Sequence, residues 1–430
     1  MEKLIQFLSF SDPNVRFVVA GCVLLTVSSA IVGCFTFLRK RALLGDAVAH
    51  SVLPGVCLSF MIAGTKNPFV LLIGAFLTGW LSLLAIDYIT RNTKLKEDTA
   101  IGLTLSVFFG IGILLLTNIQ HSGNAAQSGL DSFLFGKAAS LMLDDILIFG
   151  TVGIILIVIV FLFYKELFLI SFDENFARTI GLPVKTIELL LSTLTVMAVV
   201  VGIQAVGVVL MAAMLITPAA AARYWTSNLT SMIFLAVMLS MISGIGGAFV
   251  SYQEKNMPTG PWIVMIISVI AILSFLFSPQ KGIAARLFIQ RQHKLKILKE
   301  NILKLLFQLG EKEKNFLTER SIDEIIQKRA MEKSELKKGL RLLRLEGYVS
   351  KETTGWKLTI EGKEQGQRVT RLHRLWEMYL TEYLRIAPDH VHDDAESMEH
   401  IITPEIEQKL EEQLKHPKTD PHLSEIPYKS

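Results

Sequence analysis

Two side chains in the first half of the chain are suited to bind a cation together. Asp46 and His50 lie in an apolar region that follows the basic triplet at residues 39–41. On a helix, residues i and i+4 share a face with Cβ atoms about 5–6 Å apart, so one cation could contact both. An ionisable residue inside a membrane helix costs roughly 2.5–3.5 kcal/mol, which favours a functional role. The alternative is that both lie at the membrane boundary and only cap a helix or reach toward water.

A second set of metal-binding side chains lies near the C-terminal end. Seven of the nine histidines follow residue 280. Glu396, Glu399 and His400 stand at i, i+3 and i+4, so a helix would place them on one face. His373 and Glu377 also have the i, i+4 spacing. These carboxylate and imidazole groups, without a thiolate, favour Mn²⁺ or Fe²⁺ over a structural zinc site. An ordinary charged surface is the alternative interpretation.

The composition divides the chain into two unlike parts. The chain has 430 residues, of which 51% are hydrophobic. Residues 1–280 contain 29 Asp, Glu, Lys and Arg residues, whereas residues 281–430 contain 53. The first part therefore predicts a polytopic membrane domain and the second a charged soluble domain. The three cysteines lie in apolar segments and imply no disulfide framework.

The first part contains apolar runs of about 20 residues, the length that spans a bilayer. We expect spans near 15–38, 43–63, 67–89, 99–117, 143–164, 186–203, 205–225, 229–250 and 259–278. The sixth and seventh runs have almost no polar break, so the count is eight or nine. Lys and Arg mark cytoplasmic loops, and with nine spans this places the N-terminus outside, the 118–142 loop outside and the C-terminus inside.

One short stretch between two predicted spans, residues 171–183, stands apart. Asp173 and Glu174 near its start and Gly181 near its end are typical of a short capped helix. Such a helix would expose its apolar residues Phe172, Phe176 and Ile180. An ATPase subunit could cover them, or they could pack on neighbouring loops.

The charged part begins with a basic linker at 281–296, followed by a pattern typical of a winged helix-turn-helix. Ser321 to Lys328 and Lys333 to Leu345 predict two helices, and Gly347 ends the second. Tyr348 to Lys351 and Trp356 to Ile360 predict a β-hairpin. A long helix should run from Glu361 to about Leu384. The second helix has a basic side suited to DNA or simply to solvent: Lys333, Lys337, Lys338, Arg341 and Arg344.

Three motifs in the first part resemble those of the permeases of manganese, zinc and iron ABC importers. They are Arg41-Ala-Leu-Leu-Gly-Asp-Ala-Val-Ala-His-Ser-Val-Leu-Pro-Gly55, the stretch 207–223, and Pro258-Thr-Gly-Pro261. The resemblance covers about residues 10–280. It implies a homodimeric or paired pore in a bacterial inner membrane, a separate cytosolic ATPase and an extracellular metal-binding lipoprotein. It also implies that Asp46 and His50 line the pore and that 171–182 couples to the ATPase.

The sequence also favours a separate ATPase subunit. It contains no G-x-x-x-x-G-K-[ST] phosphate loop, so we expect ATP hydrolysis on another polypeptide and no enzymatic activity here. Asp and His ligands suit Mn²⁺, Fe²⁺ or Zn²⁺ and do not choose among them.

The second part resembles the diphtheria-toxin-repressor-like family of metal-dependent transcriptional regulators. The matching stretches are residues 371–377, 387–400, 403–405, 420–422 and 426–427. The resemblance implies a winged-helix domain over 297–370 and a metal-binding and dimerisation domain over 371–430. It makes His373, Glu396, Glu399 and His400 metal ligands, with Glu377 and His392 in an ancillary group. The glutamate at 396 points to manganese within the family.

One feature departs from that family. Its first helix normally supplies a further metal ligand, and here Asn301 and Lys304 occupy those places. Lys304 would repel a cation, so metal control of DNA binding would be weakened.

We therefore expect an all-α polytopic membrane domain followed by a cytoplasmic winged helix-turn-helix and a helical dimerisation domain. The leading interpretation joins an ATP-driven divalent-metal permease to a metal-responsive regulator of operator DNA, with 282–296 as a flexible tether or cleavage site. In a second interpretation the tail is a cytosolic metal-sensing gate of the pore. A third is secondary transport without an ATPase.

Overall fold

The chain forms two compact units, Met1–Ala285 and Arg286–Ser430. The computed structural model describes residues 6–7, 9–10, 12–64, 67–121, 136, 141–253, 257–329, 331–386 and 402–428. His392, Glu396, Glu399 and His400, predicted as metal ligands, lie outside the described residues.

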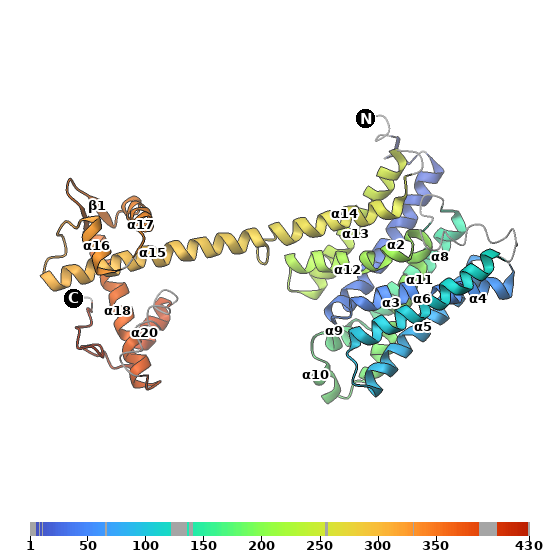
Figure 1. Cartoon of the computed structure of the whole chain (residues 1–430), viewed down its shortest axis with the longest axis horizontal. Helices are drawn as coiled ribbons and strands as arrows, with labels where there is room; N and C mark the ends of the chain where they lie inside the picture. Colours follow the sequence, from blue (N-terminus) through green and yellow to red (C-terminus); the bar gives the residue numbers. More distant parts are fainter. Residues whose placement is uncertain are drawn as a thin grey trace. The chain divides into compact units, whose positions relative to one another are not determined.

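The first unit is a bundle of helices (Figure 1). Its described helices are α2 Pro13–Leu38, α3 Leu43–Ser51, α4 Leu53–Ala63, α5 Pro68–Asn92, α6 Glu97–His121, α8 Leu143–Leu162, α9 Tyr164–Phe172, α10 Glu174–Thr179, α11 Val184–Val206, α12 Val208–Trp225, α13 Leu229–Gln253 and α14 Thr259–Phe277. In the described part of the chain, eight helical segments are long and apolar enough to cross a membrane, with α3 and α4 counted as one. The prediction of a polytopic helical membrane domain is confirmed.

Helix α12 is separate from α11 and lies alongside α14. Gly207 separates the two helices with a backbone φ of 91°, which residues other than glycine rarely adopt. The start of α12 lies beside the start of α14, because a Cβ added at Gly260 would come within 3.0 Å of the Val206 carbonyl oxygen. Its end lies beside the end of α14, because the Ser278 hydroxyl donates to the Tyr224 carbonyl at 2.5 Å. Helix α12 thus lies alongside α14 from end to end.

Helix α2 lies at the centre of the bundle, in contact with α8, α11, α12 and α13. Small residues permit this close approach, as is usual between membrane helices. A Cβ on Gly33 would lie 1.8 Å from the Leu215 carbonyl oxygen of α12. The side chain of Thr36 lies 3.3 Å from that of Thr195 on α11, joining the two hydroxyls in the buried interior.

Helices α3 and α4 form one kinked span that differs from an uninterrupted helix. They meet at Val52, and Pro54 lies in the first turn of α4. Proline has no N–H to donate to the carbonyl four residues earlier, which here belongs to His50. The kink therefore falls directly after the predicted cation-binding residue.

The second unit has the elements of a winged helix. Its described elements are α15 Ile283–Glu313 (which begins in the last residues of the first unit), α16 Ile322–Lys328, α17 Lys333–Leu345, β1 Val349–Lys351, β2 Trp356–Leu358, α18 Ile360–Glu382 and α20 Pro404–Gln413. The strands are antiparallel with Val349 opposite Leu358. The predicted helix-helix-hairpin order is confirmed. Residues 283–296 are helical, so the flexible tether that we considered for this segment is not what the structure has.

Local signals explain most of these boundaries. Ser321 accepts a hydrogen bond from the Glu324 N–H and starts α16, and Gly347 follows α17 with a φ of 81°. The second strand ends two residues earlier than predicted, because Thr359 caps α18 by accepting from the Gly362 N–H. Apolar side chains of α15, α16, α17 and both strands form one core, which includes Ile302, Leu336, Leu340 and Trp356.

Candidate functional site

Helix α3 presents Asp46 and His50 on the same side. His50 Nε2 lies 3.6 Å from Asp46 Oδ1, and the two side chains are 22% and 42% exposed for His50 and Asp46, respectively. If one cation took a bond of about 2.1 Å from each atom, the bonds would meet at roughly 120°. The pair can therefore serve as two ligands of one ion and leaves its other coordination positions open.

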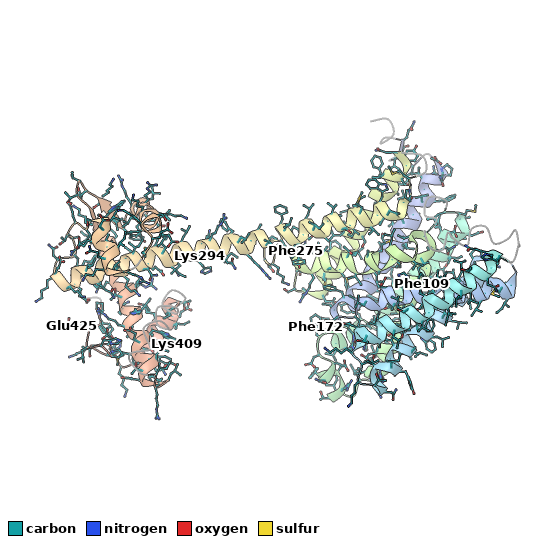
Figure 2. All side chains as sticks on the ribbon, in the orientation of Figure 1. Phe109, Phe172, Phe275, Lys294, Lys409 and Glu425 are labelled. Atoms are coloured by element: carbon teal, nitrogen blue, oxygen red, sulfur yellow. The ribbon has the colours of Figure 1, made fainter. Side chains whose placement is uncertain are left out.

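The imidazole of His50 is held by packing more than by hydrogen bonds. The ring of Phe109 on α6 meets it edge-on, with the ring centres 5.1 Å apart; Phe109 is labelled in Figure 2. The Nδ1 atom of His50 is buried and has no hydrogen-bond partner among the described residues. In metal-binding histidines the second ring N–H usually donates a hydrogen bond to a carboxylate or carbonyl, which makes the imidazole a stronger ligand. A histidine without that support is suited to an ion that binds briefly.

The pair lies on the side of α3 that the described residues of the first unit leave partly exposed. Residues of α3 on its other sides are buried against α5, α6, α11 and α12: Leu44, Gly45, Ala47, Val48, Ala49 and Ser51. Leu43, Asp46 and His50, spaced i, i+3 and i+7, remain partly or fully exposed. A carboxylate facing lipid is costly, so this side requires a polar or protein neighbour.

The short helix predicted at 171–183 is present as α10. Its N-cap is Asp173, whose Oδ1 accepts from the Phe176 N–H at 2.9 Å, and Gly181 follows the helix with a φ of 85°. Phe172, Phe176 and Ile180 are each at least half exposed. Figure 2 labels Phe172 at the end of α9. The apolar surface expected of a docking helix therefore exists.

An ion-pair network joins α10 to the start of α3, and the sequence did not indicate it. Arg39, at the end of α2, donates to the Ile170 carbonyl at 2.8 Å and to Glu174 of α10 at 3.2 Å. It also pairs with Glu188 of α11. Glu188 in turn lies 3.8 Å from Arg41, which precedes α3. The path runs from α10 through two arginines and one glutamate to the helix that carries Asp46.

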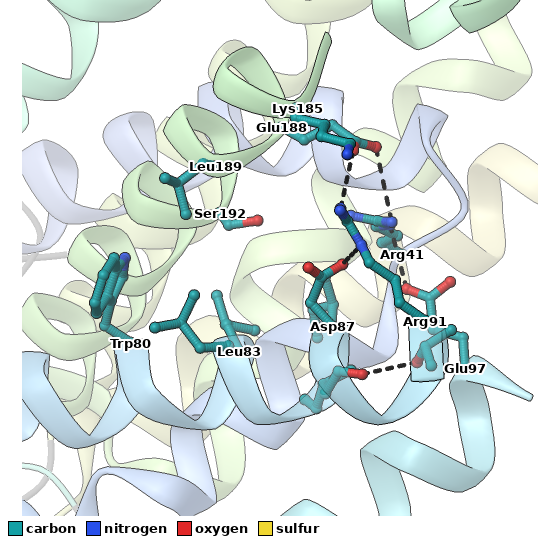
Figure 3. A pocket seen from close by; sticks show the side chains of 14 residues that line it. Arg41, Trp80, Leu83, Asp87, Arg91, Glu97, Lys185, Glu188, Leu189 and Ser192 are labelled. Atoms are coloured by element: carbon teal, nitrogen blue, oxygen red, sulfur yellow. Dashed lines mark hydrogen bonds and ion pairs between the residues drawn. The ribbon is translucent and has the colours of Figure 1, made fainter. Parts of the chain in front are cut away.

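Figure 3 shows the other side of this network, around a cavity of about 250 Å³. Arg91 lies 2.7 Å from Asp87 and 3.9 Å from Glu188, and Arg41 lies 3.2 Å from Glu97. Glu188 thus faces three arginines, two from the turn between α2 and α3 and one from α5. The sequence did not predict this network. Residues 39–41 indicated only the positive charge of a predicted cytoplasmic loop, and Glu188 is a single acid at the edge of a predicted span.

A second buried acid in the first unit is held by polar partners. Asp145 of α8 accepts from Gln204 Nε2 of α11 at 2.9 Å and from the Met142 N–H at 3.0 Å. These bonds tie α8 to α11 and give the carboxylate a structural role.

In the second unit, His373 and Glu377 come together as their spacing predicts. His373 Nε2 lies 3.2 Å from Glu377 Oε1, and both side chains are at most 3% exposed. Lys304 of α15 is equally buried, with Nζ 3.5 Å from His373 Nδ1. The other predicted ligands lie outside the described residues. Within the residues that are described, no group of three or more His, Cys, Asp or Glu side chains is placed to hold a metal ion.

Among the described residues, the neighbours of the His373 ring are not those of a metal-bound imidazole. Glu377 faces one ring nitrogen and the lysine ammonium faces the other. Asn301, the second departure from the family pattern, lines a different cavity between α15 and α17, together with Lys338 and Glu335. Asn301 and Lys304 are both buried, and Lys304 lies beside the predicted ligand His373.

Helix α17 presents all five predicted basic residues to solvent: Lys333, Lys337, Lys338, Arg341 and Arg344. Its opposite side buries Leu336, Leu340 and Leu343. Lys333 pairs with Asp323 at 2.9 Å. The other four have no ion-pair partner in the described part of the chain, so their charge is available to a polyanion.

Comparisons with known proteins agree with the two units. The model of the ABC 3 transport family matches residues 11–278. The model described as "Iron dependent repressor, metal binding and dimerisation domain" matches residues 359–428.

Three relatives show how far the similarity extends. The manganese transport system membrane protein MntC of Bacillus subtilis is 41% identical over 382 residues, which cover 89% of this chain and 87% of that protein. The zinc transport system membrane protein TroC of Treponema pallidum is 41% identical over 68% of this chain and 97% of that protein. The solved structure of PsaBC from Streptococcus pneumoniae in complex with Fab has a TM-score of 0.58 at 34% identity, covering 65% of this chain and 97% of that chain. The MntC match is longer than the first unit and so continues into the second.

Loss of a buried ion pair of this network should destabilise the first unit more than loss of an exposed one. Glu188→Gln is expected to lower the unfolding temperature of the detergent-solubilised chain, because removing a charge-assisted hydrogen bond to the buried Arg39 costs about 1–3 kcal/mol. Asp87→Asn, which breaks the exposed pair with Arg91, should cost less than about 1 kcal/mol. Equal shifts in the two variants, measured by thermal unfolding, would contradict the central place of Glu188.

Proposed function

Because the chain belongs to the ABC 3 transport family, we propose that it is the membrane-spanning subunit of an ATP-driven importer of divalent metal ions. The observation that carries this proposal is the Asp46–His50 pair, which lies on the uncovered side of α3 with its ligand atoms 3.6 Å apart. Two ligands with open coordination positions suit an ion that must be released again. A closed structural site would hold the ion too tightly for transport.

Manganese is the ion that we favour, with zinc and iron as alternatives. A relative named as a manganese transporter is 41% identical over most of the chain, whereas a zinc transporter has the same identity over a shorter part. Carboxylate and imidazole ligands accept all three ions. The metal is therefore the substrate of the first unit.

The uncovered side of α3 also supports pairing of two permease chains. Asp46 is 42% exposed within one chain, and a second chain facing it would enclose the ion path and remove the carboxylate from lipid. We propose a homodimer or a pair of related permeases, with the ion passing between the two copies of α3.

The partners that would drive transport are a cytosolic ATPase and an extracellular metal-binding lipoprotein. The chain has no phosphate loop of its own. The exposed Phe172 and Phe176 around α10 offer an apolar surface for the ATPase. The path from Glu174 through Arg39 and Glu188 to Arg41 would carry the movement of α10 to α3. This requires α10 and the second unit to lie in the cytoplasm of a bacterium, with the chain in its inner membrane.

For the second unit we propose binding to operator DNA through α17. Four of its basic side chains face solvent and have no ion-pair partner among the described residues. They lie on one side of α17, which follows α16 after a short turn. The recognition helix of winged helix-turn-helix proteins has this arrangement. The alternative is a cytosolic gate of the pore. The buried lysine at the expected metal position favours neither a metal-sensing gate nor a metal-sensing repressor, so DNA binding is the property that separates them.

The pore assignment predicts a loss of uptake without loss of the protein. Asp46→Ala and His50→Ala should each reduce uptake of radioactive Mn²⁺ by at least about tenfold, because one of two ligands is removed. Both variants should remain in the membrane fraction at normal levels. Asp98→Asn, an exposed carboxylate at the start of α6, is the matched control and should transport normally. Normal uptake by both Asp46→Ala and His50→Ala would contradict the proposal.

The DNA assignment predicts a charge-dependent complex. The purified full-length chain should retard DNA from the region upstream of its own gene. The double variant Lys337→Glu/Arg341→Glu should bind more weakly and reduce the slope of log affinity against log salt by about 1 for each phosphate that the protein no longer neutralises. Lys409→Glu, which changes an exposed lysine of α20 labelled in Figure 2, should have no effect. No retardation by the wild-type chain, together with faster metal uptake after removal of the tail, would support the gate instead.

A further inference from the structure

Lys304 is buried between α15 and α18. Its side chain is 3% exposed, and its ammonium lies 3.5 Å from His373 Nδ1. On the other side of the same ring, His373 Nε2 lies 3.2 Å from Glu377 Oε1. Lysine is seldom fully buried, because removing an ammonium from water is costly unless it is paired. A buried lysine at this position therefore needs a partner that requires its charge.

The hydrogen-bonding capacity of the imidazole decides what His373 can do. A neutral histidine carries a proton on one nitrogen and a lone pair on the other. Glu377 is an acceptor when ionised, so the proton belongs on Nε2, and the lone pair belongs on Nδ1, where the ammonium donates to it. Both nitrogens are then engaged, and no lone pair of His373 is left for a metal ion.

Further contacts near Lys304 also hold α18 against α15. Arg374 donates to both carboxylate oxygens of Glu311 on α15, at 2.9 and 2.6 Å. Gly366 allows α18 to approach α15 closely, since an added Cβ would lie 2.9 Å from the Leu303 carbonyl oxygen. The two helices are thus joined by the Lys304–His373 hydrogen bond and the Arg374–Glu311 ion pair, in addition to the close packing at Gly366.

We propose that the Lys304 ammonium is a built-in cation, which takes the place of a metal ion between α15 and α18. It bridges α15 to His373 and, through the ring, to the carboxylate of Glu377. The arrangement of the winged helix on α18 is then fixed without metal. The consequence for regulation rests on the proposed DNA binding, which would not require metal at this site; the bridge itself does not depend on it.

The test is hydrogen–deuterium exchange of the full-length chain in detergent, followed in peptides from α15 and α18, with either EDTA or MnCl₂ present. The wild-type chain should exchange equally slowly under both conditions. Lys304→Met should exchange at least roughly tenfold faster in these peptides under both conditions, because the buried partners lose their cation. Lys312→Met, which changes an exposed lysine on the same helix, is the matched control and should behave like the wild type.

Two further variants separate charge from packing. Lys304→Arg keeps a cation and should remain slow in EDTA. Lys304→Glu places a carboxylate beside His373 and Glu377, so it should be slow only when Mn²⁺ is present. The proposal is overturned if the wild-type peptides become protected only with Mn²⁺, or if Lys304→Met exchanges like Lys312→Met. The wild-type comparison holds even if a variant fails to fold. It is also independent of the DNA retardation that tests the proposed function.

Discussion

The cost of keeping a carboxylate and an imidazole within the span of α3 and α4 is the constraint on which the first unit depends. The other sides of α3 are buried against neighbouring helices, so the exposed side with Asp46 and His50 requires a polar or protein neighbour. The break at Val52 and Pro54 ends α3 directly after His50. The bundle therefore packs tightly around one short helix and leaves the side with Asp46 and His50 partly exposed.

The same helix is tied to α10 by charge. Arg41 precedes α3 and faces Glu188, which also pairs with the nearly buried Arg39. Arg39 continues to Glu174 in α10. Partly buried ion pairs of this kind are sensitive to small displacements, because they are less screened than exposed pairs. A shift of α10 would therefore change the position of α3 directly.

Local sequence signals predicted the elements and failed where long-range contacts decide the outcome. Apolar length located the spans, and caps such as Asp173 and Ser321 located the short helices. The i, i+4 spacing paired Asp46 with His50 and His373 with Glu377 because those partners share one helix. The pairing of Arg39 with Glu188, 149 residues apart, has no local signal. Lys304 was recognised as unfavourable for a metal, but only the packing of α15 on α18 brings it to His373.

We propose different sources of positive charge for the two units: a transported cation at Asp46 and His50 in the first, and the Lys304 ammonium in the second. Electron paramagnetic resonance of Mn²⁺ added to the purified full-length chain tests this contrast most directly. We predict that the signal of bound Mn²⁺ disappears in the double variant Asp46→Ala/His50→Ala and is unchanged in His373→Gln. Bound Mn²⁺ that survives the double variant and disappears in His373→Gln would contradict both assignments.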